Sequence, residues 1–210
     1  MTESGETKIP TNHSEMAQKP SRMRTKITDL LGIRYPIIQA PANFVGVPQL
    51  VAAVSNAGGF GILAPGRLAA GEIRDDIRAV RQLTDKPFGV NLIFGSPGYE
   101  KLAEVFLEEK VPLICHSRGN PKWLIDLTTG LDIKIMAMVG SVRHAIRAEQ
   151  DGTDAIMVQG EEAGGHVGYV STIVLLPLIA GKVRIPVVGA GGFCDGAGLV
   201  AALALGAEGI

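Results

Sequence analysis

A regular alternation of short apolar runs and helical stretches restricts the fold of this sequence more than any other feature. The apolar runs are rich in Ile, Val and Phe, and they end at Gly, Pro or a polar residue. Successive runs begin roughly 20–30 residues apart, which is the spacing of β-α units with a parallel sheet. The predicted strands cover residues 36–40, 59–64, 88–92, 112–116, 133–139, 155–159 and 186–190, and residues 207–210 read as the start of an eighth strand.

Helical stretches lie between these strands, and two parallel-sheet folds fit the alternation. The helical stretches cover residues 47–56, 70–83, 98–109, 142–150 and 197–205. An open doubly wound sheet would carry G-x-G-x-x-G in its first β-α turn, whereas residues 39–42 read Gln-Ala-Pro-Ala. The sequence therefore predicts an α/β fold, a (β/α)8 TIM barrel that is incomplete at the C-terminus, with strand eight only begun.

Composition and charge exclude several classes of function. Among 210 residues, 20 basic side chains face 21 acidic ones, so no basic excess indicates a nucleic-acid partner. Residues 1–24 have no apolar segment of a secretory signal, and we expect them to form a disordered tail. No apolar stretch is long enough to span a bilayer, and the two cysteines suggest a reducing compartment. We expect a cytoplasmic protein without a membrane partner.

The loop after the seventh predicted strand is a candidate phosphate site. Gly191 and Gly192 remove side chains where a backbone must approach a ligand closely, and a helix begins a few residues later. Free amides and the helix dipole then favour an anion. A plain tight turn is the alternative for this glycine pair. In a TIM barrel, however, phosphates dock between the loops after strands seven and eight, which favours the ligand site.

The loop after the sixth predicted strand carries the candidate catalytic group, His166. It follows Gly164 and Gly165 at the end of the barrel where chemistry takes place, and histidine exchanges protons near neutral pH. The alternative is a structural histidine bonded to a neighbouring carbonyl. His116, at the end of the fourth strand, is a second candidate, whereas His144 is expected on the outside of the barrel. No ligand spacing indicates a metal site, and both cysteines are expected to be small buried hydrophobes.

Three segments together resemble the nitronate monooxygenase family. The first is the sixth loop, Gln159-Gly160-x-Glu162-Ala163-Gly164-Gly165-His166. The second is Gly191-Gly192-Phe193-x-Asp195-Gly196, followed by an alanine- and leucine-rich helix, and the third is Phe88-Gly89-Val90-Asn91-Leu92. The resemblance covers residues 25–210, and it implies that they form a partial FMN-binding TIM barrel.

The resemblance also implies a cofactor site and a reaction. Nitroalkanes or nitronates would be oxidised with O2 to a carbonyl compound and nitrite, and His166 would take the proton from the nitroalkane carbon. The implied FMN contacts are Pro41, Ala42, Asn43, Asn91, Gln159, Gly164 and Gly165, with the phosphate at Ala190, Gly191 and Gly192. The same motifs occur in FMN-dependent NAD(P)H reductases of quinones or enoyl-ACP, and these form the alternative.

Three departures from the family pattern bear on this expectation. The first loop has Ala42 where the family usually has a methionine that packs against the flavin, and Met138 stands where some relatives have a lysine. The family also continues past the position of Ile210 with a further phosphate segment, a last helix and a lid. If the chain is complete, we expect weak FMN binding and self-association, and a non-catalytic fragment is a further alternative. A homodimer is compatible with these features.

Overall fold

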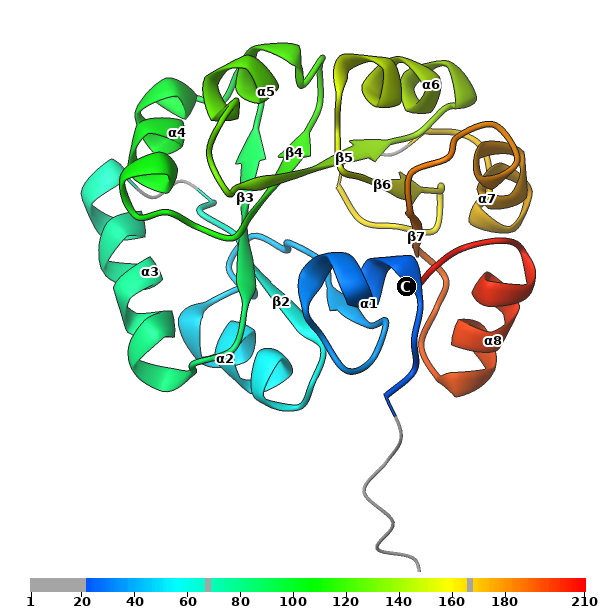
Figure 1. Cartoon of the computed structure of the whole chain (residues 1–210), viewed down its shortest axis with the longest axis horizontal. Helices are drawn as coiled ribbons and strands as arrows, with labels where there is room; N and C mark the ends of the chain where they lie inside the picture. Colours follow the sequence, from blue (N-terminus) through cyan, green and yellow to red (C-terminus); the bar gives the residue numbers. More distant parts are fainter. Residues whose placement is uncertain (1–21, 67–68, 166–167) are drawn as a thin grey trace, which may run out of the picture.

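Seven parallel strands form one sheet that curls into a ring, and the helices lie outside it in the computed structural model (Figure 1). The structure describes residues 22–66, 69–165 and 168–210. The strands, hydrogen-bonded in chain order, are β1 (Ile38–Gln39), β2 (Phe60–Leu63), β3 (Phe88–Ile93), β4 (Leu113–Ser117), β5 (Lys134–Val139), β6 (Ala155–Gln159) and β7 (Val187–Ala190). The helices are α1 (Lys26–Leu31), α2 (Pro48–Asn56), α3 (Ala70–Leu83), α4 (Tyr99–Glu108), α5 (Lys122–Thr128), α6 (Val142–Asp151), α7 (Thr172–Ala180) and α8 (Gly196–Ala204).

Residues 208–210 lie between β7 and β1 and join the two ends of the sheet. The amide of Glu208 donates to the carbonyl of Val187 at 2.7 Å. The amide of Ile38 donates to the carbonyl of Ile210, also at 2.7 Å, and Gly209 forms a parallel bridge with Val188. The predicted start of an eighth strand is thus confirmed. The fold is the predicted TIM barrel with its eighth strand only begun.

The seven predicted strands and five predicted helices are all present, with small shifts at their ends. Helices α1, α5 and α7 were not among the predicted elements. Helix α7 is apolar on all sides, so it lacks the period that marks an amphipathic helix. Helix α1 has six residues and begins at a capping box formed by Thr25 and Thr28, and α5 has only seven. Helices this short give little periodic signal.

The apolar core has an inner and an outer layer. The inside of the ring is filled by buried side chains such as Phe60, Met136 and Met157, and α1 adds Ile27 from the end where the strands begin. The outer layer packs the strands against the surrounding helices. One close contact is at Gly61, where a Cβ atom would lie 2.4 Å from the carbonyl oxygen of Val51 in α2. The ring is therefore a filled barrel, and in a fold of this kind a ligand site is expected at the ends of the strands.

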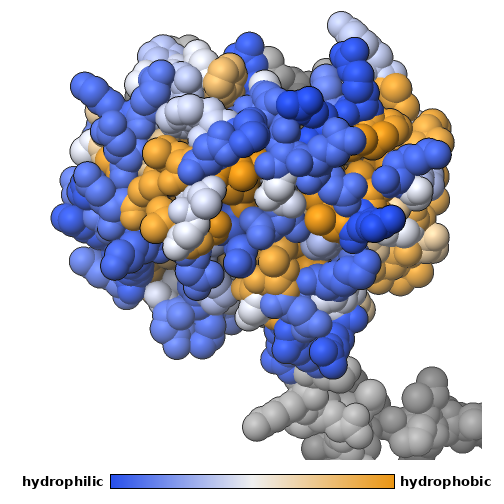
Figure 2. Space-filling view, turned by 45° about the horizontal axis from the view of Figure 1, so that its top comes forward, coloured by the Kyte–Doolittle hydropathy of each residue, from blue (hydrophilic) through white to orange (hydrophobic). Residues whose placement is uncertain are grey.

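The surface over α7 and α8 is unusually apolar. Figure 2 shows hydrophobic residues gathered on the right of the molecule, where Figure 1 places these helices. Ile173, Leu178 and Val200 are each more than half exposed. None of the helices in the described part of the chain is both long and apolar enough to cross a membrane.

The predicted tail, residues 1–24, falls almost entirely outside the described residues. Only its last three residues, 22–24, are described. Arg22 and Arg24 form ion pairs with Asp29 in α1, at 2.9 and 3.1 Å. The amide of Met23 donates to the carbonyl of Arg34 at 3.2 Å. These contacts join residues 22–24 to the barrel.

Candidate functional site

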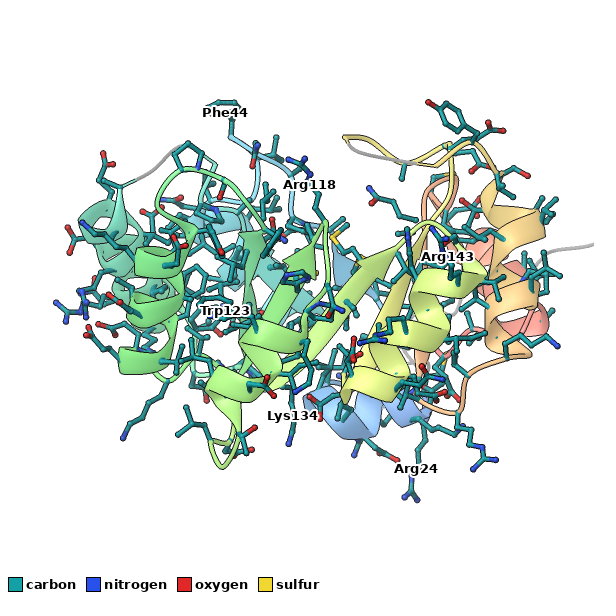
Figure 3. All side chains as sticks on the ribbon, turned by 90° about the horizontal axis from the view of Figure 1, so that it is seen from above. Arg24, Phe44, Arg118, Trp123, Lys134 and Arg143 are labelled. Carbon is teal, nitrogen blue, oxygen red and sulfur yellow. The ribbon has the colours of Figure 1, made fainter. Side chains whose placement is uncertain are left out.

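Two cavities open at the end of the barrel where the strands terminate. The larger one, which we call the mouth cavity, has a volume of about 1020 Å³ and lies over the ends of β4, β5 and β6. The smaller one, the seam cavity, has about 490 Å³ and lies between β1 and β7, next to the start of α8. Figure 3 places Phe44 and Arg118 at this end of the molecule, opposite Arg24 and Lys134. The position is the one that TIM-barrel enzymes use for chemistry.

A series of hydrogen bonds between side chains runs beneath the mouth cavity. The Nδ2 atom of Asn91, which is buried, donates to the carbonyl oxygen of Cys115 at 2.7 Å and to Oγ of Ser117 at 2.8 Å. The hydroxyl of Ser117 donates in turn to Sδ of Met138 at 2.9 Å. These hydrogen bonds hold the side chains of Ser117 and Met138 in place at the wall of the cavity.

The loop after β6 forms one wall of the mouth cavity. Its turn is held by Gln159, whose Nε2 donates to the carbonyl oxygen of Gly164 at 2.9 Å. Gly165 has a φ of +85°, in the left-handed region that glycine adopts without strain. A Cβ atom built at Gly164 or Gly165 would meet none of the described atoms within 4 Å. The backbone here is open to a ligand.

Glu162, in the same loop, links this loop to α7. Its carboxylate accepts hydrogen bonds from the amide of Thr172 at 2.8 Å and from the Thr172 hydroxyl at 2.7 Å. These bonds keep the pKa of Glu162 below its ordinary value. The ionised carboxylate therefore holds the loop to the first turn of α7.

The loop after β7 carries the glycine pair singled out as a phosphate site. Gly191 and Gly192 have φ values of +102° and +81°. Among hydrogen bonds between described residues, none uses the amide of either glycine. Asp195 caps α8 through a 2.8 Å bond from the amide of Gly198. The side of the seam cavity formed by Ala190 and Gly191 is thus bare backbone next to a helix start, which suits an anion.

The predicted site residues fall into five groups. Asn43, Gln159 and Gly165 line the mouth cavity, and Ala190 and Gly191 line the seam cavity. Neighbours of these in the chain are Pro41, Ala42, Gly164 and Gly192. Asn91 lies below the mouth cavity, where it supports Ser117. His166 lies outside the described residues. The contacts of all these residues with a cofactor, and the catalytic role of His166, stay predictions.

His116, the second candidate base, does not line either cavity. It is 3% exposed, and its ring centroid lies 6.2 Å from that of Phe94. Its neighbour Cys115 packs in the inner layer. Because side chains alternate along a strand, His116 points outward from the ring. Burial lowers its pKa from 6.5 to about 4, so the imidazole is neutral at pH 7.

This buried imidazole predicts a loss of stability in mild acid. The unfolded chain takes up a proton near pH 6.5, whereas folded His116 resists protonation down to about pH 4. The stabilising contribution is present above pH 6.5 and is lost as the pH falls through this window, to a total of about 3 kcal/mol. Urea unfolding at pH 7 and pH 5 should show a loss of about 2 kcal/mol at the lower pH.

The matched control for this prediction is the exposed His144. His116→Gln should flatten the pH dependence between pH 7 and pH 5, because glutamine takes up no proton. His144→Gln should leave the pH dependence as it is in the original chain. Equal pH dependence in the two variants would show that His116 does not cause it.

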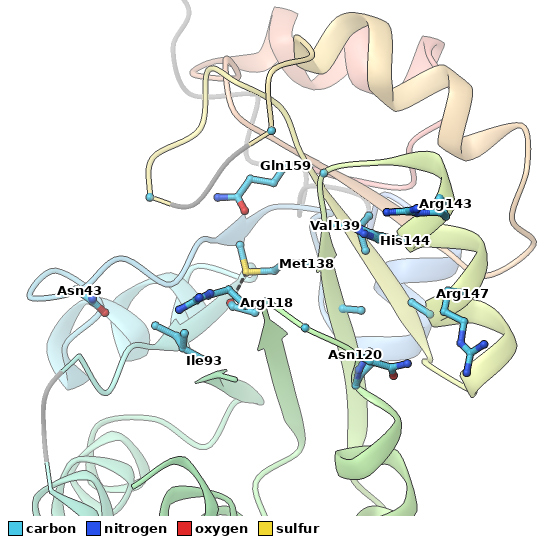
Figure 4. A pocket seen from close by; sticks show the side chains of 18 residues that line it. Asn43, Ile93, Arg118, Asn120, Met138, Val139, Arg143, His144, Arg147 and Gln159 are labelled. Carbon is cyan, nitrogen blue, oxygen red and sulfur yellow. Dashed lines mark hydrogen bonds between the residues drawn. The ribbon is translucent and has the colours of Figure 1, made fainter. Parts of the chain in front are cut away.

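Helix α6 contributes side chains to the mouth cavity that were not predicted to lie there. His144 was expected on the outside of the barrel, yet it lines this cavity with Arg143 and Arg147 (Figure 4). The signal was present in the chain, since only Gly140 and Ser141 separate β5 from α6. A connection this short places the first turn of the helix at the rim of the barrel.

The cysteines and acidic residues hold no metal site in the described ranges. No group of three or more His, Cys, Asp or Glu side chains there could bind a metal ion. Cys115 is buried as expected, and burial raises the pKa of its thiol to about 12. The expectation that Cys194 is also buried was wrong: it is exposed and lines the seam cavity. It follows the Gly191-Gly192 turn, which carries it to the surface.

Comparison with known proteins identifies relatives of this barrel. The family model described as nitronate monooxygenase matches residues 24–98 and 94–210. A (3aS,4S,5R,7aS)-5-hydroxy-7a-methyl-1-oxo-octahydro-1H-indene-4-carboxyl-CoA dehydrogenase of Rhodococcus jostii is 40% identical, over 90% of this chain and 54% of the relative. A probable nitronate monooxygenase of Staphylococcus aureus is 34% identical, over 89% of this chain and 66% of the relative. The chain thus spans about half the length of the dehydrogenase and two thirds of the other protein.

Two solved structures share the barrel. The structure of FabK from Thermotoga maritima matches with a TM-score of 0.87 and 44% identity, over 89% of this chain and 60% of that one. Nitroalkane oxidase from Streptomyces ansochromogenes matches with a TM-score of 0.81 and 31% identity, over 88% and 66%. The relatives in both comparisons are oxidoreductases.

Proposed function

Since the chain belongs to the nitronate monooxygenase family, we propose that it forms the FMN-binding barrel of an oxidoreductase that oxidises alkyl nitronates and nitroalkanes. The products would be a carbonyl compound and nitrite, with O2 as co-substrate. The observation that carries this proposal is the bare, glycine-rich backbone beside both cavities at the end of the barrel.

The residues present fit a flavin. Gly164 and Gly165 leave their side of the mouth cavity free of side chains, so a flat ring can lie against the backbone. Asn43 and Gln159 offer amide groups to the polar edge of such a ring. The contacts proposed for the ring are Pro41, Ala42, Asn43, Asn91, Gln159, Gly164 and Gly165, and those proposed for the phosphate are Ala190, Gly191 and Gly192. FMN, when bound, supplies the electron-accepting ring.

His166 is proposed to take the proton from the nitroalkane carbon. It follows directly on Gly165, which lines the mouth cavity. Histidine is the side chain that ordinarily exchanges protons near neutral pH, which suits general-base work. A pre-formed nitronate has already lost this proton and does not need the base.

The visible absorption spectrum of the purified chain tests the proposal. The chain is measured before and after addition of excess FMN and desalting. We expect retained flavin absorption, and nitrite release with O2 consumption when an alkyl nitronate is added. A chain that stays colourless after loading would favour the non-catalytic fragment. A yellow chain that releases no nitrite would contradict nitronate oxidation and leave the flavin site in place.

A second reaction is favoured by the size and charge of the mouth cavity. Its 1020 Å³ leave space beside a flavin ring for a substrate larger than a small nitroalkane, and Arg118, Arg143 and Arg147 line it. The relatives named as a CoA-thioester dehydrogenase and as FabK are the more identical ones, at 40% and 44%. The second candidate is therefore an FMN-dependent reductase that uses NAD(P)H and acts on enoyl thioesters or quinones. Stopped-flow mixing separates the two, since rapid anaerobic bleaching by NADH or NADPH supports the reductase and bleaching by a nitronate supports the oxygenase.

The cytoplasmic location and the homodimer stay proposals as well. The exposed apolar side chains of α7 and α8 support self-association, because apolar surface of this kind is removed from water in a dimer.

A further inference from the structure

The mouth cavity extends from the barrel into a polar pocket that the proposed flavin site does not use. We call this extension the α6 arm and define it by Asn120, Arg143, His144 and Arg147. Figure 4 shows Arg143, His144 and Arg147 projecting from α6, with Asn120 at the start of α5 below them. Met138 and Gln159 lie at the other end of the same cavity, nearer the barrel axis.

The charge of the cavity is opposite to that of the chain. The chain as a whole has a net charge of −1, but the eighteen described residues that line the mouth cavity include three arginines and no carboxylate. Within the described ranges, no acidic group lies within 4.0 Å of Arg118 or Arg143. Arg147 is held by Asp151 through a 2.9 Å contact of its Nε atom with Oδ2. The cavity therefore carries excess positive charge.

Folding alone gives no reason for Arg143, whereas Arg147 forms an ion pair with Asp151 one turn further along α6. Arg143 and Arg147 are four residues apart, so their like charges face the same side of the helix and repel. Arg143 also lies in the first turn of the helix, where the dipole disfavours a cation and where no acidic residue is present. A bound anion would relieve both unfavourable interactions. An anionic ligand at this place would therefore stabilise Arg143 in the first turn of α6.

We propose that the α6 arm binds the diphosphate group of an elongated substrate whose reactive end reaches the barrel mouth. A guanidinium group can donate two parallel hydrogen bonds to phosphate oxygens. Arg143 and Arg147, four residues apart on α6, both line this part of the cavity. The Oδ1 atom of Asn120 accepts from the amide of Lys122 at 2.7 Å, which orients the side chain and leaves Nδ2 to donate to a ligand.

The ligand class is a nucleoside diphosphate carrying a redox-active or acyl end. Nicotinamide dinucleotides and coenzyme A thioesters share this chemistry, so the adenosine diphosphate unit is common to both. The inference rests on the second proposed reaction, since nitroalkanes, nitronates and O2 carry no diphosphate, whereas nicotinamide dinucleotides and coenzyme A thioesters do.

The test is a calorimetric titration in which ADP is added to the full chain after the chain has been saturated with FMN. We expect saturable binding that weakens as salt concentration rises, because the contacts are ionic. Arg143→Gln should raise the dissociation constant for ADP by about tenfold or more, since one charge-assisted phosphate contact is lost. Arg184→Gln is the matched control, because Arg184 is exposed and lies at the opposite end of the barrel, before β7. It should leave ADP binding unchanged.

Two results would overturn the inference. One is the absence of saturable ADP binding, and the other is an equal effect of Arg143→Gln and Arg184→Gln. Displacement of bound ADP by coenzyme A at lower concentration than by NADPH identifies the thioester as the source of the diphosphate, and the reverse order identifies the dinucleotide. FMN retention is measured separately by absorption. A chain that binds ADP through Arg143 but holds no FMN would refute the proposed flavin function and leave the α6 arm intact.

Discussion

Gly191→Ala is expected to raise the dissociation constant for FMN by about tenfold or more. Gly191 has a φ of +102°, and a Cβ atom there would lie 2.6 Å from the amide nitrogen of Ala163. The added methyl group must push the loop after β7 away from the loop after β6. Because these two loops border the proposed phosphate and ring sites, both sets of contacts change together. FMN titration followed by fluorescence quenching measures the effect.

Gly130→Ala is the matched control for Gly191→Ala. Gly130 also has a left-handed φ, of +83°, but its Cβ position is open, and it lies between α5 and β5 at the other end of the barrel. Both substitutions cost about 1–2 kcal/mol of backbone energy. Only Gly191→Ala should weaken FMN. Unchanged FMN affinity in a folded Gly191→Ala variant would place the phosphate elsewhere.

His166→Ala is expected to lower the turnover of neutral nitroalkanes by about 10²- to 10⁴-fold, the usual contribution of a general base. Turnover of the pre-formed nitronate should stay close to that of the unsubstituted chain, because this substrate has no proton to give up. Steady-state nitrite release on the two forms of one compound measures both values.

The two substrate forms make this experiment its own control. FMN content is measured on the same samples, so that loss of cofactor is recognised. An equal loss of activity on nitroalkane and nitronate, with FMN retained, would contradict proton abstraction by His166. If only a thioester or quinone is turned over, the same variant tests whether His166 serves the reductase reaction.

Much of the fold follows from local patterns. Apolar runs and helical periods repeat at the spacing of β-α units, so the strands from β2 to β7 and the longer helices were predictable, as was the start of an eighth strand at residues 207–210. The short helices and the wholly apolar α7 were not predicted, because they lack a periodic signal. The position of the two cavities was also predictable, since parallel strands end at the same rim of a barrel.

The sequence by itself determined the barrel, the common direction of its strands and the glycine-rich loops on its rim. All three depend on the order of residues along one strand and the turn after it. Only the tertiary structure decided what surrounds each side chain. It turned His116 outward into a buried position, where desolvation lowers its pKa, and it set Asn91 beneath Ser117. It also brought Arg143 of α6 to the same cavity as Gln159 of β6. These outcomes depend on contacts between separate β-α units, which no local pattern encodes.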